Sequence, residues 1–145
     1  MLVSINEEDP TPIYLQIVRQ IKEQILVGEL RADEELPSVR ELGDALGISL
    51  HTARSAYQSL SDEGLLRIRL GKKARTAAIP QAASSEVSDV EDGVIDAISG
   101  RMRDVVIDAL LRGVPQHAIR SVLDGQIEDL DARRMEATRR TEKEE

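Results

Sequence analysis

The middle of the chain carries the strongest constraint on the fold, because it marks two short helices in close succession. Ser38 followed three residues later by Glu41 is a capping-box pattern at a helix start. Ser49 is a second N-cap, and Gly47 just before it can adopt a positive φ between the helices. Gly64 ends the second helix. Two short helices joined by a turn of about three residues containing glycine are a helix-turn-helix.

A longer helix is expected before this motif. Thr11 can cap it, Pro12 suits its first position, and apolar residues recur at helical spacing as far as Leu26. Gly28 follows as a plausible C-terminal stop. The polar stretch 31–37 then reads as a connection.

After the motif the periodicity changes from helical to alternating. Residues 66–70 alternate apolar side chains with arginines, a period of two that predicts a strand. A basic turn follows at 71–73, and residues 76–79 are expected to return as a second strand. A hairpin placed directly after the second helix of a helix-turn-helix is a wing.

The rest of the chain predicts a second, helical unit. Residues 80–89 are small and polar and are interpreted as a linker. Residues 90–131 carry two helical apolar patterns interrupted at Gly113 and Pro115, which predicts an αα-hairpin. Two helices alone cannot shield broad apolar stripes, so a partner surface is expected. The charged residues 132–145 are expected to fray.

Composition excludes several classes of protein. The chain has 145 residues and no cysteine, which removes disulfides, thiolate metal sites and cysteine nucleophiles. Its core must be aliphatic, since Tyr14 and Tyr57 are the only aromatic residues. No apolar run reaches the roughly 18–20 residues of a membrane helix, and acidic residues 7–9 do not suit a secretory signal. We therefore expect a cytoplasmic protein without a membrane partner.

An enzyme is the weakest functional alternative. The two histidines are isolated, and neither a phosphate-cradling glycine loop nor a metal-ligand spacing is present in the sequence. We expect no catalytic residues, no metal and no cofactor.

Charge is unevenly distributed along the chain. The net charge of −8 at first argues against a nucleic-acid partner. Residues 40–80, however, carry seven basic and four acidic side chains, whereas residues 81–145 carry nine basic and fifteen acidic ones. The basic excess therefore falls on the helix-turn-helix and the wing, where DNA would be contacted.

The helix-turn-helix region resembles the GntR family of transcription factors. The resemblance rests on the order and spacing of five blocks within residues 10–79: 12–17 (PIYLQI), 36–42 (LPSVREL), 46–49 (LGIS), 52–54 (TAR) and 57–66 (YQSLSDEGLL). The C-terminal hairpin, with its turn at 109–113, resembles the reduced domain of the YtrA-type subfamily.

This resemblance implies a mainly α protein, with a winged helix-turn-helix DNA-binding domain over 1–79 and a C-terminal αα-hairpin dimerisation domain. It further implies dimerisation through the C-terminal helices and repression of nearby genes. The wing departs from the family pattern of Gly-x-Gly followed by a small residue and an aromatic. Here Gly71 is followed by Lys72 and Lys73, which predicts more reliance on phosphate attraction.

We assign the expected DNA contacts to three places, namely the second motif helix, the start of the first motif helix and the wing. The N-terminal part of the second motif helix enters the major groove, where the planar fork of Arg54 can bind guanine O6 and N7 or a phosphate. Arg40 matches the family arginine that touches DNA, although an i,i+4 pair with Asp44 would also explain it. The expected DNA-binding residues are Ser38, Arg40, His51, Thr52, Arg54, Ser55, Lys72, Lys73 and Arg75.

Two matters stay open at the level of sequence. A winged helix used for protein assembly without DNA binding is the main alternative, and the overall acidity favours it slightly. A small-molecule effector, if one exists, is unidentified, because the short hairpin is too small to enclose a pocket of ~300–1,000 Å³ within one subunit.

Overall fold

The computed structural model describes residues 3–78 and 92–143. The chain divides into two compact units, one made of residues 1–79 with 131–145 and the other of residues 80–130. The expected linker at 80–89 lies outside the described residues.

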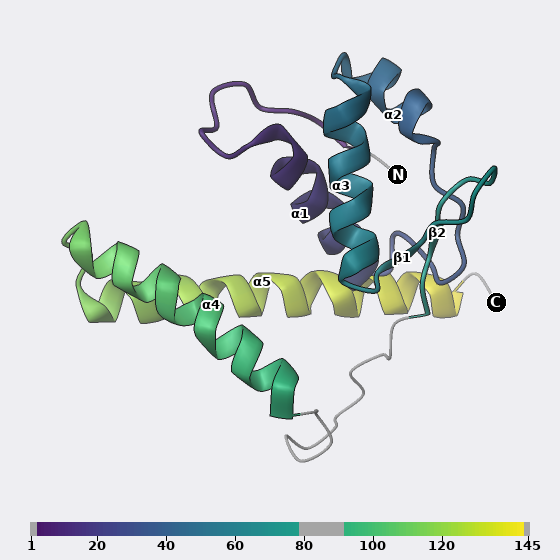
Figure 1. Ribbon diagram of the computed structural model, residues 1–145. Coiled ribbons are helices and arrows are strands. Elements are labelled where there is room, and N and C mark those ends of the chain that lie inside the picture. Colours follow the sequence, from purple (N-terminus) through teal and green to yellow (C-terminus); the bar gives the residue numbers. More distant parts are fainter. Residues whose placement is uncertain (1–2, 79–91, 144–145) are drawn as a thin grey trace. The chain divides into compact units, whose positions relative to one another are not determined.

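The first unit is a winged helix-turn-helix, as the sequence predicts. Its elements, labelled in Figure 1, are α1 (Ile13–Leu26), α2 (Val39–Leu46), α3 (Leu50–Asp62), β1 (Leu66–Arg67) and β2 (Arg75–Thr76). α1 and α2 both pack against α3. The two strands form a small antiparallel hairpin directly after α3.

The helix boundaries in the motif follow from capping. The capping box is confirmed: Glu41 N–H donates to the Ser38 hydroxyl at 3.2 Å, and Ser38 N–H donates to a Glu41 carboxylate oxygen at 2.7 Å. Gly47 ends α2 in the left-handed region with φ of 66°. Ser49 then caps α3 by accepting from Thr52 N–H at 3.1 Å. These local bonds set the turn between the helices.

The start of α1 differs from the expectation. Its N-cap is Pro12, and no side chain caps the helix. Thr11 instead donates its N–H to Asp9 Oδ1 at 2.8 Å and accepts from the Gln16 side chain at 2.9 Å. A proline carries no N–H and fixes φ, so it can begin a helix without a side-chain cap.

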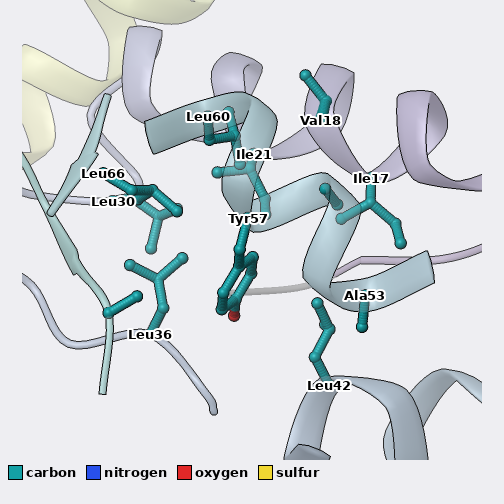
Figure 2. Close-up of a cluster of buried hydrophobic side chains, with 12 residues drawn as sticks. Ile17, Val18, Ile21, Leu30, Leu36, Leu42, Ala53, Tyr57, Leu60 and Leu66 are labelled. Carbon is teal, nitrogen blue, oxygen red and sulfur yellow. The ribbon is translucent and has the colours of Figure 1, made fainter. Parts of the chain in front are cut away.

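The core of the first unit is aliphatic except for one tyrosine. Figure 2 shows Ile17 and Ile21 of α1 facing Tyr57 and Leu60 of α3. All four side chains are essentially inaccessible to solvent. The Tyr57 hydroxyl donates to the Pro37 carbonyl at 2.7 Å, which satisfies the polar end of the ring. The core thereby fixes α3 relative to the start of α2.

The wing strands are shorter than predicted, and the second begins one residue earlier. The two strands pair at two positions, Leu66 with Thr76 and Arg67 with Arg75. The alternation in residues 66–70 does not mark a half-buried strand, because Ile68 and Leu70 are exposed. The connection before α2 provides further pairing instead: Leu36 N–H donates to the Ala74 carbonyl at 2.9 Å.

The second unit contains α4 (Asp92–Leu111) and the first part of α5 (Gln116–Lys143). Gly113 forms the turn between them with φ of 79°. The two helices diverge from this turn in Figure 1. Exposed large apolar side chains occur along both helices of this unit: Val94, Ile95, Ile98, Met102, Val105, Val106, Ile107, Leu110, Leu111, Val122, Leu123 and Ile127.

The charged C-terminal segment differs from the expected frayed tail. α5 remains helical as far as Lys143. Glutamate, arginine, alanine and methionine all have high helix propensity, so a charged segment of this composition can extend a helix. Within the first unit, Arg133 of this segment forms an ion pair with Glu23 of α1. In the part of the chain described here, no helix has the length and apolar character needed to span a membrane.

Candidate nucleic-acid interface

The N-terminal half of α3 presents two exposed side chains suited to a DNA groove. His51 and Arg54 are exposed, and their spacing of three residues places them on the same side of the helix. Neither takes part in an ion pair among the described residues. Arg54 therefore offers its full set of guanidinium donors to a ligand.

Thr52 and Ser55 are half-buried and less available than their neighbours. Thr52 also belongs to the cap of α3, since its hydroxyl lies 2.8 Å from the Ser49 hydroxyl. Its structural role is visible in the fold, whereas its role toward DNA stays a prediction.

The start of α2 places a second exposed arginine close to helix N-terminal amides. Arg40 is exposed, and the alternative ion pair with Asp44 is not formed. The amides of a helix's first turn together with an arginine favour a phosphate. Ser38 is engaged in the capping box, so its side chain has a structural function irrespective of any DNA contact.

Glu41 connects the start of α2 to the wing. The backbone N–H of Ser38 and the ammonium of Lys73, with its Nζ 3.1 Å from Glu41 Oε2, lower the pKa of the Glu41 carboxyl to about 2. Glu41 therefore stays ionised at neutral pH and holds Lys73 against α2. Lys73 is an expected DNA contact, and its ion pair with Glu41 also connects the wing to α2.

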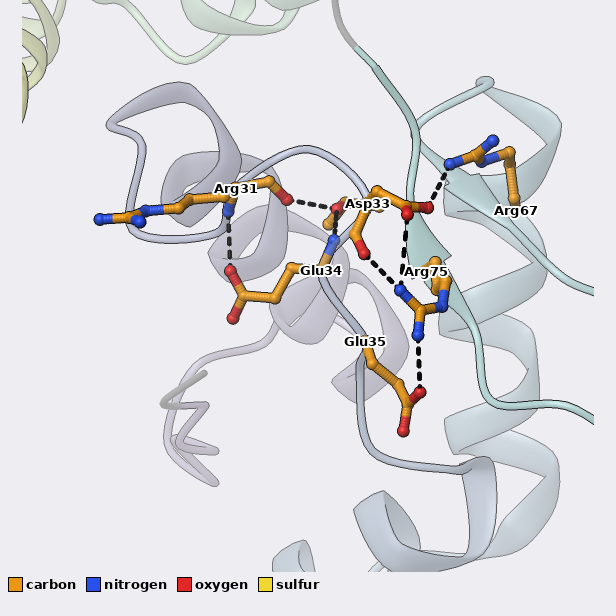
Figure 3. A network of polar contacts seen from close by, with 7 residues as sticks. Arg31, Asp33, Glu34, Glu35, Arg67 and Arg75 are labelled. Atoms are coloured by element: carbon orange, nitrogen blue, oxygen red, sulfur yellow. Dashed lines mark hydrogen bonds and ion pairs between the residues drawn. The ribbon is translucent and has the colours of Figure 1, made fainter.

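Two further wing cations are paired with acidic residues of the connection before α2 (Figure 3). Arg75 lies 3.1 Å from Glu35 Oε2 and 3.5 Å from Asp33 Oδ2, and it donates to the Asp33 carbonyl at 2.7 Å. Arg67 donates to Asp33 Oδ1 at 2.5 Å. The expected contact Arg75 is thus neutralised in the free protein.

The tip of the wing has a different character. Lys72, an expected contact, and Arg69 are exposed and form no ion pair among residues 3–78 and 92–143. Leu70 between them is completely exposed. Sequence reasoning left Arg67 and Arg69 out of the site, because their alternation with apolar residues was interpreted only as a strand pattern.

A hollow of about 520 Å³ brings these wing residues together. Five of the lining residues are basic and two are acidic: Arg67, Arg69, Lys72, Lys73, Arg75, Asp33 and Glu35. Its surface is therefore predominantly cationic and suited to an anion such as a phosphate group.

Residues 13–75, which span the three helices and the wing, match the family described as bacterial regulatory proteins, gntR family. The chain is also 32% identical to the HTH-type transcriptional repressor YtrA of Bacillus subtilis over 113 residues, which cover 78% of this chain and 82% of YtrA. The chain belongs to the GntR family. It carries the winged helix-turn-helix DNA-binding domain of that family, and its similarity to YtrA agrees with the YtrA-type subfamily.

A second relative matches a shorter part of this chain. The HTH-type transcriptional repressor NagR of Bacillus subtilis is 50% identical over 64 residues, which cover 44% of this chain and 26% of NagR. This GntR-family chain therefore spans only about a quarter of NagR's length. Both relatives are transcriptional regulators rather than enzymes.

Solved structures give the same fold. A transcriptional antiterminator from Listeria monocytogenes EGD-e has a TM-score of 0.71 and 25% identity, covering 90% of this chain and 92% of its own. YtrA from Sulfolobus acidocaldarius, a GntR-family transcription factor, has a TM-score of 0.50 and 29% identity, covering 89% of this chain and 99% of its own. Both similarities extend over the helical C-terminal region as well as the winged helix.

Proposed function

We propose that this GntR-family chain represses transcription by binding an inverted-repeat operator as a homodimer. The observation that carries the proposal is the set of exposed, unpaired side chains Arg40, His51 and Arg54 at the N-terminal ends of α2 and α3. The capping bonds and the Tyr57–Pro37 hydrogen bond hold these two helix ends in a fixed relation. Such preorganisation reduces the entropy lost on binding DNA.

In this proposal α3 lies in the major groove and Arg54 reads a guanine. Its planar guanidinium matches guanine O6 and N7, a contact worth about 1–3 kcal/mol against the wrong base. Arg40 binds a backbone phosphate beside the first turn of α2, and the wing lies over the adjacent backbone or minor groove. Phosphate contacts position the protein, and base contacts select the sequence.

Dimerisation is assigned to the apolar side chains of the second unit. Val94, Ile98, Met102 and Val105 recur at three- and four-residue spacing on one side of α4, and each is exposed. A second copy of the chain is the occupant that an inverted repeat requires, because it presents the same surface under two-fold symmetry. The paired recognition helices would enter major grooves about one turn, ~34 Å, apart.

The repressor part of the proposal is supported by the relatives, since NagR and YtrA are both named as repressors. A cytoplasmic location belongs to the same proposal, because bacterial operators lie in that compartment. No effector is proposed.

The test begins with a duplex selected from a random library by the full-length protein. Its binding is then followed by fluorescence anisotropy at two salt concentrations for wild type, Arg54→Ala and Arg19→Ala. Arg19 is an exposed arginine of α1 outside the proposed interface and serves as the matched control. We expect the Arg54 variant to lose about 5- to 150-fold in affinity, from the 1–3 kcal/mol of a bidentate base contact. Failure to select any duplex, or equal affinity for all three proteins, would refute the proposal.

A protein-assembly module is the second candidate. The net charge of −8 and the pairing of wing cations with acids favour it over a protein that binds DNA through bulk positive charge. It predicts that the double variant Arg40→Ala, Arg54→Ala keeps full regulatory activity in a reporter strain. Loss of regulation in that variant, with the fold intact by circular dichroism, would eliminate this candidate.

A further inference from the structure

Apart from Lys73, which pairs with Glu41 of α2, the basic residues of the wing fall into two sets that differ in their partners. At the base of the wing, Arg67 and Arg75 contact the carboxylates of Asp33 and Glu35. Toward the tip, Arg69 and Lys72 form no ion pair among the residues described. Both sets line the same hollow. The hollow is therefore lined both by cations without an ion-pair partner among the described residues and by cations that are paired with a carboxylate.

The acidic residues are fixed by the backbone rather than by the ion pairs themselves. The connection before α2 runs beside β2, with a bridge between Glu35 and Arg75. Thr76 N–H donates to the Glu34 carbonyl at 3.0 Å, and Glu34 N–H donates to the buried Thr76 hydroxyl at 2.8 Å. Replacing Glu35 by glutamine therefore removes the charge and should leave the backbone of this connection in place.

Asp33 is held in a conformation that few residues adopt. Its φ is 60°, in the left-handed region where aspartate and asparagine are among the better tolerated side chains. From this position one carboxylate reaches both Arg67 and Arg75 (Figure 3). Asparagine at this position would keep the backbone geometry and remove the charge.

We propose that Asp33 and Glu35 are specificity-determining residues that occupy the guanidiniums of Arg67 and Arg75 as phosphates would, and so limit sequence-independent DNA binding. The inference rests on the proposed function, because it concerns the same DNA interface. A phosphate must displace a carboxylate before it can bind Arg75, whereas Arg69 and Lys72 accept one directly. Non-operator complexes depend on phosphate contacts alone, so neutralised cations weaken them.

Release of the cations has different consequences on the two kinds of DNA. On the operator, the base contacts of α3 fix the orientation of the protein. On other DNA no base contact fixes the orientation, so the protein can shift until an exposed cation meets a phosphate. Removing an acid therefore favours non-operator DNA more, and the ratio of the two affinities falls.

The test compares wild type, Glu35→Gln, Asp33→Asn and Glu34→Gln. Glu34→Gln is the matched control, because it removes the same charge from the same connection, yet Glu34 accepts from Arg31 N–H at 2.8 Å and contacts no wing cation. The probes are the duplex selected by wild type and a scrambled duplex of equal length and composition. Circular dichroism establishes that each variant is folded.

For Glu35→Gln we expect the scrambled duplex to bind more tightly, with a slope of log K against log salt that is steeper by about 0.9 for one additional phosphate. This corresponds to an extra affinity loss of about threefold between about 50 and about 200 mM salt. Asp33→Asn should act in the same direction, and Glu34→Gln should stay close to wild type.

Two results overturn the inference while leaving the proposed function intact. One is selective operator binding by wild type with an unchanged salt slope in both Glu35→Gln and Asp33→Asn. The other is an equal gain in all three variants, which would show that total charge rather than release of Arg67 and Arg75 governs the affinity. Absence of any selected duplex for wild type would overturn the proposed function and this inference together.

Discussion

The two units of this protein use similar aliphatic residues at helical spacing, yet among the described residues only the first unit buries them completely. In the first unit, Ile17 and Ile21 of α1 are fully buried because α3 covers them. In the second unit, Ile98 of α4 retains 45% and Val105 68% of its accessible surface. Periodicity is therefore enough to form a helix, but burial requires an additional element that covers the apolar side.

The difference predicts how each unit responds to substitution. The winged helix has an internal core, so its free energy of unfolding should not depend on protein concentration. Among the described residues, most apolar side chains of α4 and the first part of α5 are exposed, and in the proposed dimer their contribution depends on association with the second copy. Changes in the first unit should alter unfolding irrespective of concentration, and changes in the second should alter assembly.

The largest expected effect is in the core of the first unit. Leu60→Ala removes a fully buried side chain and should lower the free energy of unfolding by about 2–5 kcal/mol, measured by urea denaturation. Met102→Ala in α4 provides the contrast, because Met102 belongs to the proposed dimer surface and is exposed. Its effect should grow as the protein is diluted, whereas that of Leu60→Ala should not. Equal, concentration-independent losses in both variants would remove the distinction between the units.

The next effect concerns assembly. Ile98→Lys places a charge on the apolar side of α4 and should convert the proposed dimer to a monomer, measured by sedimentation equilibrium. Operator affinity should fall by about a hundredfold, because each monomer then binds a half-site separately. Ile107→Lys makes the same change nine residues further on, half a turn away around the helix, and should remain dimeric. A dimer that survives Ile98→Lys would refute this surface as the interface.

A smaller effect is expected at the one buried aromatic residue. Burial raises the pKa of Tyr57, and its hydroxyl donates to the Pro37 carbonyl. Tyr57→Phe keeps the ring but removes that donor, which should cost about 1–2 kcal/mol in the free energy of unfolding. Arg54 should then be held less firmly toward DNA, so operator affinity should fall slightly as well. An unchanged urea midpoint would show that the hydrogen bond contributes nothing to the core.

The smallest effect is the acid dependence due to Glu41. Its pKa in the folded protein, about 2, lies below the ordinary 4.5, so its stabilising contribution is complete above the ordinary value and is lost as pH falls toward 2. Urea midpoints of wild type should therefore decrease over this interval more steeply than those of Glu41→Gln. Glu29→Gln, at an exposed position outside the cap, serves as the control. Parallel pH profiles for wild type and Glu41→Gln would contradict the prediction.

The sequence predicted the helix-turn-helix well because its signals are local. Ser38 with Glu41, Gly47 and Ser49 act within one turn of their own helices, so spacing alone locates the ends of α2 and α3. The wing strands were predicted less well. Backbone pairing between the connection at 34–36 and residues 74–76 joins segments about forty residues apart, and no local pattern reports it.

In the candidate site, too, some features follow from local sequence signals and others from contacts between distant segments. Exposure of Arg40, His51 and Arg54 follows from their positions on capped amphipathic helices. The pairing of Arg67 and Arg75 with Asp33 and Glu35 does not, since both arginines look like free surface cations in the sequence. Only the folded chain shows which wing cations already have partners.

The sequence by itself determined the caps of α2 and α3 and the type of domain, because hydrogen bonding and helical periodicity act over a few residues. The tertiary structure decided which apolar surfaces are covered and which charges are neutralised, because both depend on distances between segments far apart in the chain. Ile21 and Ile98 occupy comparable positions on their helices, and only packing makes one a core residue and leaves the other exposed.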